Sequence, residues 1–127
     1  MHEMALVRTV LDEVLKICED KPIAEVCTVH LTIGEMHDVV DAYVPGLFRY
    51  LARGTICENA EIVITRVPVR MRCNECGRVF EVDLHALSMK ELQAIACPHC
   101  GAVRKYRMVS GREFRIENIE VAQRVGA

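Results

Sequence analysis

The chain is poor in aromatic side chains, in net charge and in long apolar runs. It has no Trp, aromatic residues make up 5% of the sequence, and the formal net charge is −2 over 127 residues. The small net charge disfavours a protein that binds polyanions in general. No apolar run is long enough to span a membrane, and no basic stretch precedes an apolar one at the N-terminus. We therefore expect no membrane anchor and no secretory signal.

Apolar residues nevertheless make up 51% of the chain, which is enough for a packed core. The length allows one domain with a small attached lobe. Charge is unevenly divided, with 5 Lys+Arg against 11 Asp+Glu in residues 1–65 and 11 against 7 in residues 66–127. The 7 cysteines are an odd number, which excludes complete disulfide pairing within the chain. We expect a cytoplasmic protein with reduced thiols, in which clustered cysteines bind a metal or act in catalysis.

Four cysteines form two C-x-x-C pairs, each followed by glycine: Cys73 and Cys76, Cys97 and Cys100. Gly77 and Gly101 tolerate the left-handed conformation that lets backbone N–H groups point at the sulfurs. Four thiolates suit tetrahedral Zn(II), and we expect this zinc to be structural because no ligand position remains for water. A redox dithiol would need only one such pair.

The segment between Met71 and Met108 holds few large apolar side chains. We therefore expect metal binding to supply the folding free energy of this lobe. Basic residues flank the cysteines, and the simplest explanation is that they offset the negative charge of the thiolates. These residues are Arg66, Arg70, Arg72, Arg78, Arg104, Lys105 and Arg107.

Outside the cysteine segment, the periodicity predicts two helices and three strands. Apolar residues recur at helical spacing over residues 4–19, and Asp20-Lys21-Pro22 ends this helix. Alternation predicts strands at residues 25–33, 61–67 and 113–121, with a bulge near Asn118 in the last. A second helix ends near Arg53; it either kinks at Pro45 or begins there.

This order of elements predicts the α+β class. We expect a three-stranded sheet with two helices, plus an inserted zinc-ribbon-like lobe built around the four paired cysteines. The predicted α/β domain comprises residues 1–69 and 110–127, and the predicted zinc-binding lobe comprises residues 70–109.

Met1-His2-Glu3 places several nitrogen atoms within a few bonds of one another. A bulky residue at position 2 normally leaves the initiator Met in place, so we expect the free amine to belong to Met1. This amine, the His2 amide nitrogen and the imidazole can chelate a metal, and the Glu3 amide nitrogen can extend the set. Ni²⁺ and Cu²⁺ favour such nitrogen ligands in a square plane. Taken alone, however, His2 is better explained as a polar residue at a frayed terminus.

Met1-His2-Glu3 followed by an amphipathic helix resembles the HypA/HybF family of hydrogenase nickel-incorporation proteins. Further segments resemble the same family along nearly the whole chain: Ile33-Gly34-Glu35, Gly54-Thr55-Ile56, Ala60-Glu61 and the pairs Cys73/Cys76 and Cys97/Cys100. The resemblance implies a nickel metallochaperone rather than an enzyme. Such a protein helps to load Ni(II) into [NiFe]-hydrogenase and, in some organisms, into urease.

By this resemblance, nickel binds at Met1, His2 and Glu3, and Zn(II) binds the four paired cysteines. His85 is the one histidine between the cysteine pairs and a candidate extra nickel ligand, although an exposed loop histidine is the simpler explanation. The implied partners are a nickel-incorporation GTPase and the hydrogenase large subunit. We expect no membrane or nucleic-acid partner, and either a monomer or a homodimer.

The remaining histidines and cysteines are expected to be structural. We expect His30 to support its strand, His37 with Asp38 to cap the second helix, and His99 to face solvent. Three cysteines behave most simply as small buried apolar residues: Cys18, Cys27 and Cys57.

The alternative function is that of a zinc-ribbon module that binds nucleic acid or a protein. Its support is the basic second half of the chain, in which Phe80, Tyr106 and Phe114 lie among basic residues. Four thiolates and one Zn²⁺ carry a formal charge of about −2, however, which reduces the excess of positive charge. Aromatic residues are also sparse for a surface that stacks bases.

Overall fold

The computed structural model describes residues 2–125, and for His2 it describes the main chain alone. The chain divides into two compact units. The sheet unit comprises Met1–Thr32, Asp38–Thr65 and Arg115–Ala127, and the cysteine unit comprises Ile33–His37 and Arg66–Phe114. The predicted fold class is confirmed, because helices, small sheets and a four-cysteine lobe are all present. The domain boundaries predicted at residues 69/70 and 109/110 stay predictions.

The first helix, α1, runs over His2–Cys18 and covers its own sheet with one apolar stripe. Ile17, another apolar residue near the end of α1, is 42% exposed. Helix α1 ends as predicted: Asp20 takes a positive φ of 61°, and Pro22 follows. The buried members of the stripe are Leu6, Val7, Val10, Leu11, Val14 and Cys18.

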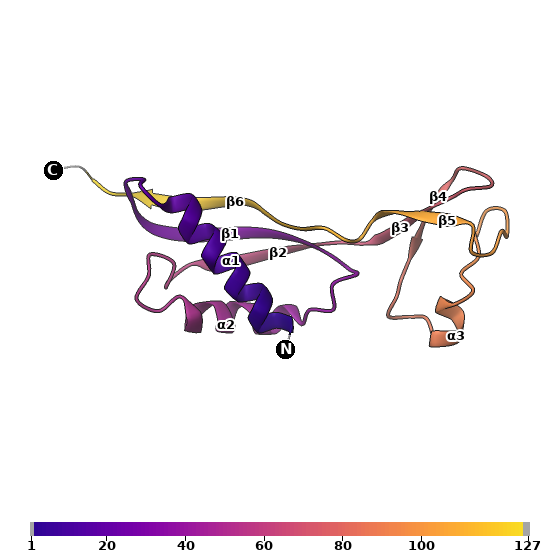
Figure 1. Ribbon diagram of the computed structural model, residues 1–127, viewed down its shortest axis with the longest axis horizontal. Coiled ribbons are helices and arrows are strands. Elements are labelled where there is room, and N and C mark those ends of the chain that lie inside the picture. The colour runs from indigo at the N-terminus through magenta and orange to yellow at the C-terminus, as the bar shows by residue number, and fades with distance from the viewer. Residues whose placement is uncertain (1, 126–127) are drawn as a thin grey trace. The chain divides into compact units, whose positions relative to one another are not determined.

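The predicted three-stranded sheet is present, in the order β2-β1-β6. Its strands are β1 at Ile23–Gly34, β2 at Glu61–Val67 and β6 at Phe114–Gln123. Helix α1 crosses these strands in Figure 1 and contacts α2. Strand β1 supplies the central buried side chains, among them Val29 and Leu31. The prediction of a bulge near Asn118 stays a prediction.

Strand β1 departs from strict alternation, and this corrects one expectation. Val26 and Val29 are both fully buried although they lie three residues apart, and Cys27 is exposed. The Val26 N–H donates to the Ile56 carbonyl at 2.8 Å, outside the strand ladder, so the strand is irregular at this point. The prediction that Cys27 is buried was therefore wrong. The predictions for Cys18 and Cys57 were right.

The second helix begins beside Pro45, which was one of the two possibilities that the sequence allowed. A 3-10 turn, η1, at Asp41–Tyr43 leads into α2 at Val44–Leu51, with the proline in the first turn of α2. Proline is tolerated there because the first N–H groups of a helix have no partner within the helix. Val44 and Phe48 are each 1% exposed and anchor the helix. There is no kink, and the regular helix begins beside Pro45.

The cysteine unit contains a second three-stranded sheet that the sequence pattern did not predict. Its order is β4-β3-β5, with β3 at Val69–Cys73, β4 at Val79–Val82 and β5 at Tyr106–Ser110. A short helix, α3, lies at Met89–Leu92. The buried core consists of Val69, Met71, Cys73, Phe80, Val82 and Cys97.

Two segments of the cysteine unit pass very close to each other. The Gly34 N–H donates to the Glu113 carbonyl at 2.7 Å, and the Met36 N–H donates to the Gly111 carbonyl at 2.9 Å. A Cβ atom on Gly34 would lie 2.0 Å from the Gly111 carbonyl oxygen. Glycine at position 34 is therefore what allows this backbone pairing.

Among the described residues, no helix is both long enough and apolar enough to cross a bilayer.

Candidate metal centres

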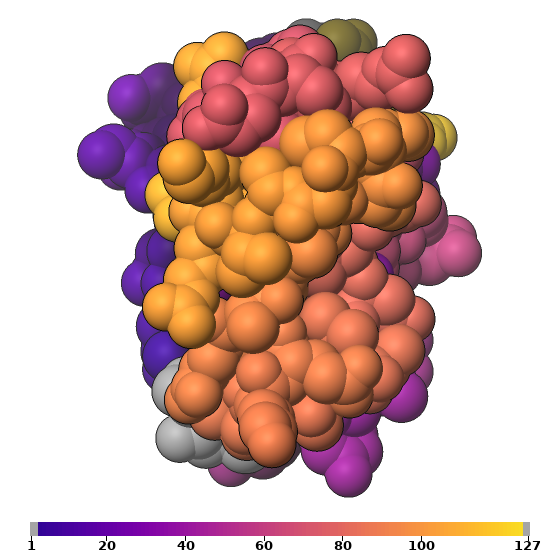
Figure 2. All heavy atoms as spheres, turned by 90° about the vertical axis from the view of Figure 1, so that its right-hand side faces the viewer, coloured from indigo at the N-terminus to yellow at the C-terminus, as the bar shows by residue number. Residues whose placement is uncertain are grey.

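The four paired cysteines meet at one point in the cysteine unit. Cys73 ends β3 and Cys76 follows in the turn before β4, while Cys97 and Cys100 lie in the turn that leads towards β5. Their four Sγ atoms all lie within 4.8 Å of one another. Among the side chains that the structure describes, this is the one such group of His, Cys, Asp or Glu ligands. Figure 2 shows the two turns, coloured salmon and orange, against each other at the top of this face.

Each turn is closed by the same two backbone hydrogen bonds. In the first turn the Cys73 N–H donates to the Arg78 carbonyl, and the Gly77 N–H donates back to the Cys73 carbonyl, both at 2.9 Å. The second turn repeats these bonds at 2.9 and 2.8 Å. Gly77 and Gly101 take φ values of 77° and 79°, the left-handed region that their positions predicted. Both turns thus hold their two sulfurs on the same side.

The sulfur geometry fits a tetrahedral zinc ion. Cys73 Sγ lies 3.5 Å from Cys100 Sγ, and Cys76 Sγ lies 3.7 Å from Cys97 Sγ. Sulfurs at the usual Zn–S bond length of about 2.3 Å from a tetrahedral centre stand about 3.8 Å apart. These separations are therefore close to those that zinc requires.

Backbone N–H groups stabilise negative charge on the sulfurs. The Glu75 N–H lies 3.4 Å from Cys73 Sγ, and the His99 N–H lies 3.4 Å from Cys97 Sγ. The pKa of Cys73 is lowered to about 7, first by the backbone N–H of Cys76 and also by that of Glu75. A thiolate, the form that binds a metal, is therefore accessible near neutral pH at Cys73, whereas the hydrogen bond shared with Cys73 helps to raise the pKa of Cys100. Sequence reasoning had located the glycines but not these individual donors.

Two of the basic residues near the cysteines bond to the turns themselves. Lys105 Nζ lies 3.2 Å from a Glu75 carboxylate oxygen, and the Arg72 guanidinium donates to the Gly77 carbonyl at 2.8 Å. Both side chains brace the first turn. The expectation that the basic flanks offset the charge of the thiolates stays a prediction.

The N-terminal candidates lie at the edge of what the structure describes. Met1 and the His2 side chain fall outside the described residues, and the His2 main chain begins α1. The Glu3 side chain is only 8% exposed and accepts a hydrogen bond from the Val40 N–H at 3.2 Å. Val40 precedes η1, so this bond fixes the start of α1 to the start of η1. Nothing in the sequence singled out Val40, because a main-chain donor has no residue-type pattern.

His85 lies in the loop after β4, and its side chain is 72% exposed. Its Nε2 atom lies 3.7 Å from a carboxylate oxygen of Glu35 in the same unit. The Asp83 carboxylate accepts the His85 backbone N–H at 3.0 Å and shapes the loop. These contacts agree with the simpler explanation, an exposed loop histidine, and its role as a nickel ligand stays a prediction.

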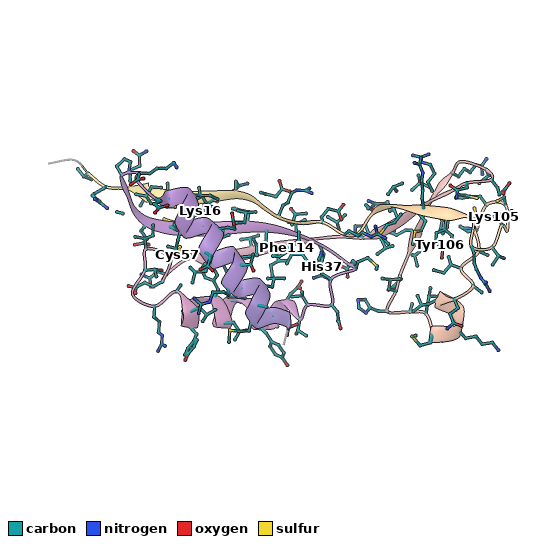
Figure 3. The ribbon with its side chains drawn as sticks, in the orientation of Figure 1. Lys16, His37, Cys57, Lys105, Tyr106 and Phe114 are labelled. Carbon is teal, nitrogen blue, oxygen red and sulfur yellow. The ribbon has the colours of Figure 1, made fainter. Side chains whose placement is uncertain are left out.

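The other histidines have structural contacts. His37 Nε2 lies 3.1 Å from the Arg112 carbonyl oxygen. The His37 ring packs edge-on against Phe114, with ring centroids 5.8 Å apart (Figure 3). His37 therefore does not cap the second helix, as the sequence had suggested, because a 3-10 turn starting after residue 40 intervenes. His30 bonds to Glu120 across the sheet at 2.8 Å, and His99 is exposed as expected.

Two of the three aromatic side chains that lie among the basic residues pack together in the cysteine unit. Phe80 is buried in the cysteine unit, and Tyr106 packs against it edge-on with ring centres 6.3 Å apart. Phe114 is engaged by His37. Base stacking requires exposed ring faces, so the nucleic-acid alternative loses the aromatic part of its support.

Comparison with known proteins gives a consistent result. The model of the family described as hydrogenase/urease nickel incorporation, metallochaperone, HypA matches residues 1–121. A protein of Geobacter metallireducens called hydrogenase maturation factor HypA is 36% identical over 122 residues, covering 95% of this chain and 99% of the relative. The equivalent protein of Caldanaerobacter subterraneus is 31% identical, covering 95% and 99%.

Two solved structures share the fold. The solution structure of the nickel metallochaperone HypA from Helicobacter pylori has a TM-score of 0.61 at 18% identity, covering 97% of this chain and 99% of that one. A second solution structure of a HypA protein has a TM-score of 0.65 at 20% identity, covering 96% and 97%.

Proposed function

Because the chain belongs to the HypA family of hydrogenase/urease nickel-incorporation metallochaperones, we propose that it binds Ni(II) at its own N-terminus and delivers it for maturation of [NiFe]-hydrogenase. Urease is the other client that the family description names. The observation that carries the proposal is the family match, which begins at residue 1 and so includes Met1-His2-Glu3. The protein acts as a carrier rather than a catalyst, and we place it in the cytoplasm.

The proposed nickel ligands are the Met1 amine, the His2 amide nitrogen and imidazole, and the Glu3 amide nitrogen. Consecutive main-chain nitrogens close five-membered chelate rings, and Ni²⁺ favours the square plane that they define. The buried Glu3 carboxylate supports this arrangement, since its bond to Val40 fixes the residue that contributes the last nitrogen. His85 stays a secondary candidate ligand.

Selectivity cannot rest on affinity alone. Cu²⁺ binds such nitrogen ligands more tightly than Ni²⁺. Selection must therefore come from the supply of metal and from docking to the proteins that give and receive it. The partners we propose are a nickel-incorporation GTPase and the hydrogenase large subunit. A chelate at a chain end suits transfer, because a partner can replace its ligands one at a time.

The second metal of the proposal is a structural Zn(II) held by Cys73, Cys76, Cys97 and Cys100. Four thiolates fill a tetrahedral sphere, and when bound the ion supplies cross-linking of the two turns rather than chemistry. The chain's own residues hold the sulfurs in place through the paired backbone bonds of each turn. Two of the four cysteines, Cys73 and Cys97, also form part of the buried core of their unit.

Nickel titration with three forms of the zinc-loaded protein tests the nickel site. The forms are the chain with its authentic N-terminus, the His2→Ala variant and a form extended by a few residues before Met1. We expect tight binding, with the absorption of square-planar nickel, for the authentic chain alone. His30→Ala is the matched control, because His30 bonds to Glu120 within the sheet. Equal binding by all forms would show that the proposed site is wrong.

Measurement of zinc content tests the structural site separately. Cys76→Ser should lose zinc and the hydrogen-exchange protection of β3–β5, because one of four ligands is gone. Cys27→Ser makes the same substitution at an exposed cysteine outside the cluster and should keep one zinc per chain. Zinc retained at one equivalent in Cys76→Ser would refute the four-thiolate assignment.

A further inference from the structure

A groove with an apolar floor lies between β4 and α3 in the cysteine unit. Its volume is about 590 Å³. Phe80 and Val82, each 7% exposed, and the half-buried Leu87 and Ile95 contribute its apolar lining. In Figure 2 the segment around α3 forms the lower part of the face towards the viewer. The structural zinc site does not use this groove, since none of the four cysteines lines it.

The rim of the groove is acidic, although the cysteine unit as a whole is rich in basic residues. Glu81, Asp83 and Glu91 line it against the single basic residue Lys90. Glu91 is held in place by a capping box, in which its carboxylate accepts the Ser88 N–H at 3.1 Å. A Glu81 carboxylate oxygen lies 3.9 Å from the guanidinium of Arg70 on β3. Three carboxylates around an apolar floor favour a ligand that carries both apolar and basic groups.

Strand β4, which lines the groove, is an edge strand of its sheet. It lies at the end of the sheet order β4-β3-β5 and pairs with β3 on one side. An edge strand carries backbone N–H and C=O groups that can pair with an added strand. Peptides that bind in this way gain affinity from main-chain hydrogen bonds and specificity from alternate side chains.

We propose that the groove between β4 and α3 docks an extended segment of a partner protein in which apolar and basic side chains alternate. Its apolar side chains fill the floor formed by Phe80 and Val82. Its basic side chains lie against Glu81, Asp83 and Glu91. The inference goes beyond nickel binding, because it assigns a protein-docking role to the cysteine unit and requires no nickel.

The probe is a short, capped peptide of alternating lysine and valine, with a glutamate–valine peptide of the same length as its counterpart. Each is titrated into zinc-loaded, isotope-labelled full-length protein without nickel, and amide chemical shifts are followed. We expect saturable shifts at β4 and α3 with the lysine peptide, and amides of β4 that become slower to exchange. The glutamate peptide should cause no saturable change.

Two variants test the groove itself. Asp83→Lys should weaken binding of the lysine peptide by at least tenfold, whereas Glu13→Lys, the same charge change on the exposed face of α1, should not. Ala94→Tyr should block the groove from its exposed lip, and Ala122→Tyr is the matched substitution on β6. Both alanines are exposed, so neither substitution disturbs the core.

The proposal fails if the lysine peptide gives no saturable shifts, if both peptides bind equally, or if Asp83→Lys leaves the affinity unchanged. It also fails if sedimentation shows a dimer of this chain that Ala94→Tyr dissociates, because the groove would then be occupied by a second copy. The peptide titrations contain no nickel, so their results do not depend on whether His2→Ala loses nickel binding. The docking proposal and the nickel proposal are therefore tested separately.

Discussion

The close approach between Gly34 and Gly111 predicts that one added methyl group, in Gly34→Ala, destabilises the protein. In Gly34→Ala the new Cβ would lie 2.0 Å from the Gly111 carbonyl oxygen and 2.2 Å from its carbonyl carbon. Contacts this short do not occur in folded proteins, and both atoms belong to the backbone, so no side chain can rotate away. The two segments must therefore separate.

Separation removes the two backbone hydrogen bonds that join the segments, from Gly34 to Glu113 and from Met36 to Gly111. Each such bond contributes about 0.5–1.5 kcal/mol. The displaced backbone also disturbs the packed residues around it, and overpacking of this kind costs about 1–3 kcal/mol. We therefore expect Gly34→Ala to lower the free energy of unfolding by about 2–6 kcal/mol.

Urea unfolding of the zinc-loaded protein, followed by circular dichroism, measures this loss. Hydrogen exchange at the amide of Met36 reports on the junction directly. Gly46→Ala is the control: Gly46 lies within α2, and a Cβ there meets nothing within 4 Å. Alanine should stabilise the helix at that position by up to about 1 kcal/mol. If Gly34→Ala unfolds within about 0.5 kcal/mol of the unmodified chain, the steric reasoning is refuted.

Three other predictions concern the sheet unit. Iodoacetamide at pH 8 should alkylate exposed Cys27 quickly and leave Cys57 unmodified, because burial above all raises the pKa of Cys57 to about 11; peptide mass spectrometry showing equal rates would contradict this. Phe48→Ala should cost about 3–5 kcal/mol and Phe48→Leu clearly less, since the ring is 1% exposed; equal unfolding midpoints would argue against tight packing there. Hydrogen bonds, first from the Thr32 hydroxyl, lower the pKa of Glu117 below its ordinary value near 4.5. The carboxylate therefore stabilises the fold above that value and loses this effect as the pH falls through the lowered pKa, so the stability gap between the unmodified chain and Glu117→Gln should close on acidification; a gap independent of pH would refute it.

The sequence predicted the elements whose pattern is long or chemically distinctive. The helical stripe of α1 extends over several turns, and the cysteine pairs with their glycines specify both a ligand type and a backbone conformation. These features depend on local sequence alone. They therefore could be read before any packing was known, and the four sulfurs do meet.

The errors came from features that depend on tertiary context. Strict alternation places Cys27 on a buried face, but β1 is irregular beside Val26 and the cysteine is exposed. The sheet of the cysteine unit is hard to predict because β3 alternates apolar residues with Arg70 and Arg72, and two arginines beside a cysteine pair resemble a charged flank as much as the outer face of a strand. The residue types at His37 and Asp38 predict a helix cap, but they do not show that a 3-10 turn at Asp41–Tyr43 precedes the helix.

The two proposed metal sites make opposite demands on the chain. A structural zinc must be retained, and its thiolate ligands lie in two turns closed by backbone hydrogen bonds, with Cys73 and Cys97 almost fully buried. A transported nickel must be released, so its ligands have to exchange without unfolding their surroundings. Glu3 is 8% exposed and accepts a hydrogen bond from the Val40 N–H, and the proposed amine and imidazole ligands precede it in the sequence. We therefore expect ligand exchange at Met1 and His2 to leave the core intact, and a substitution at Glu3 to slow or weaken nickel loading without changing the zinc content.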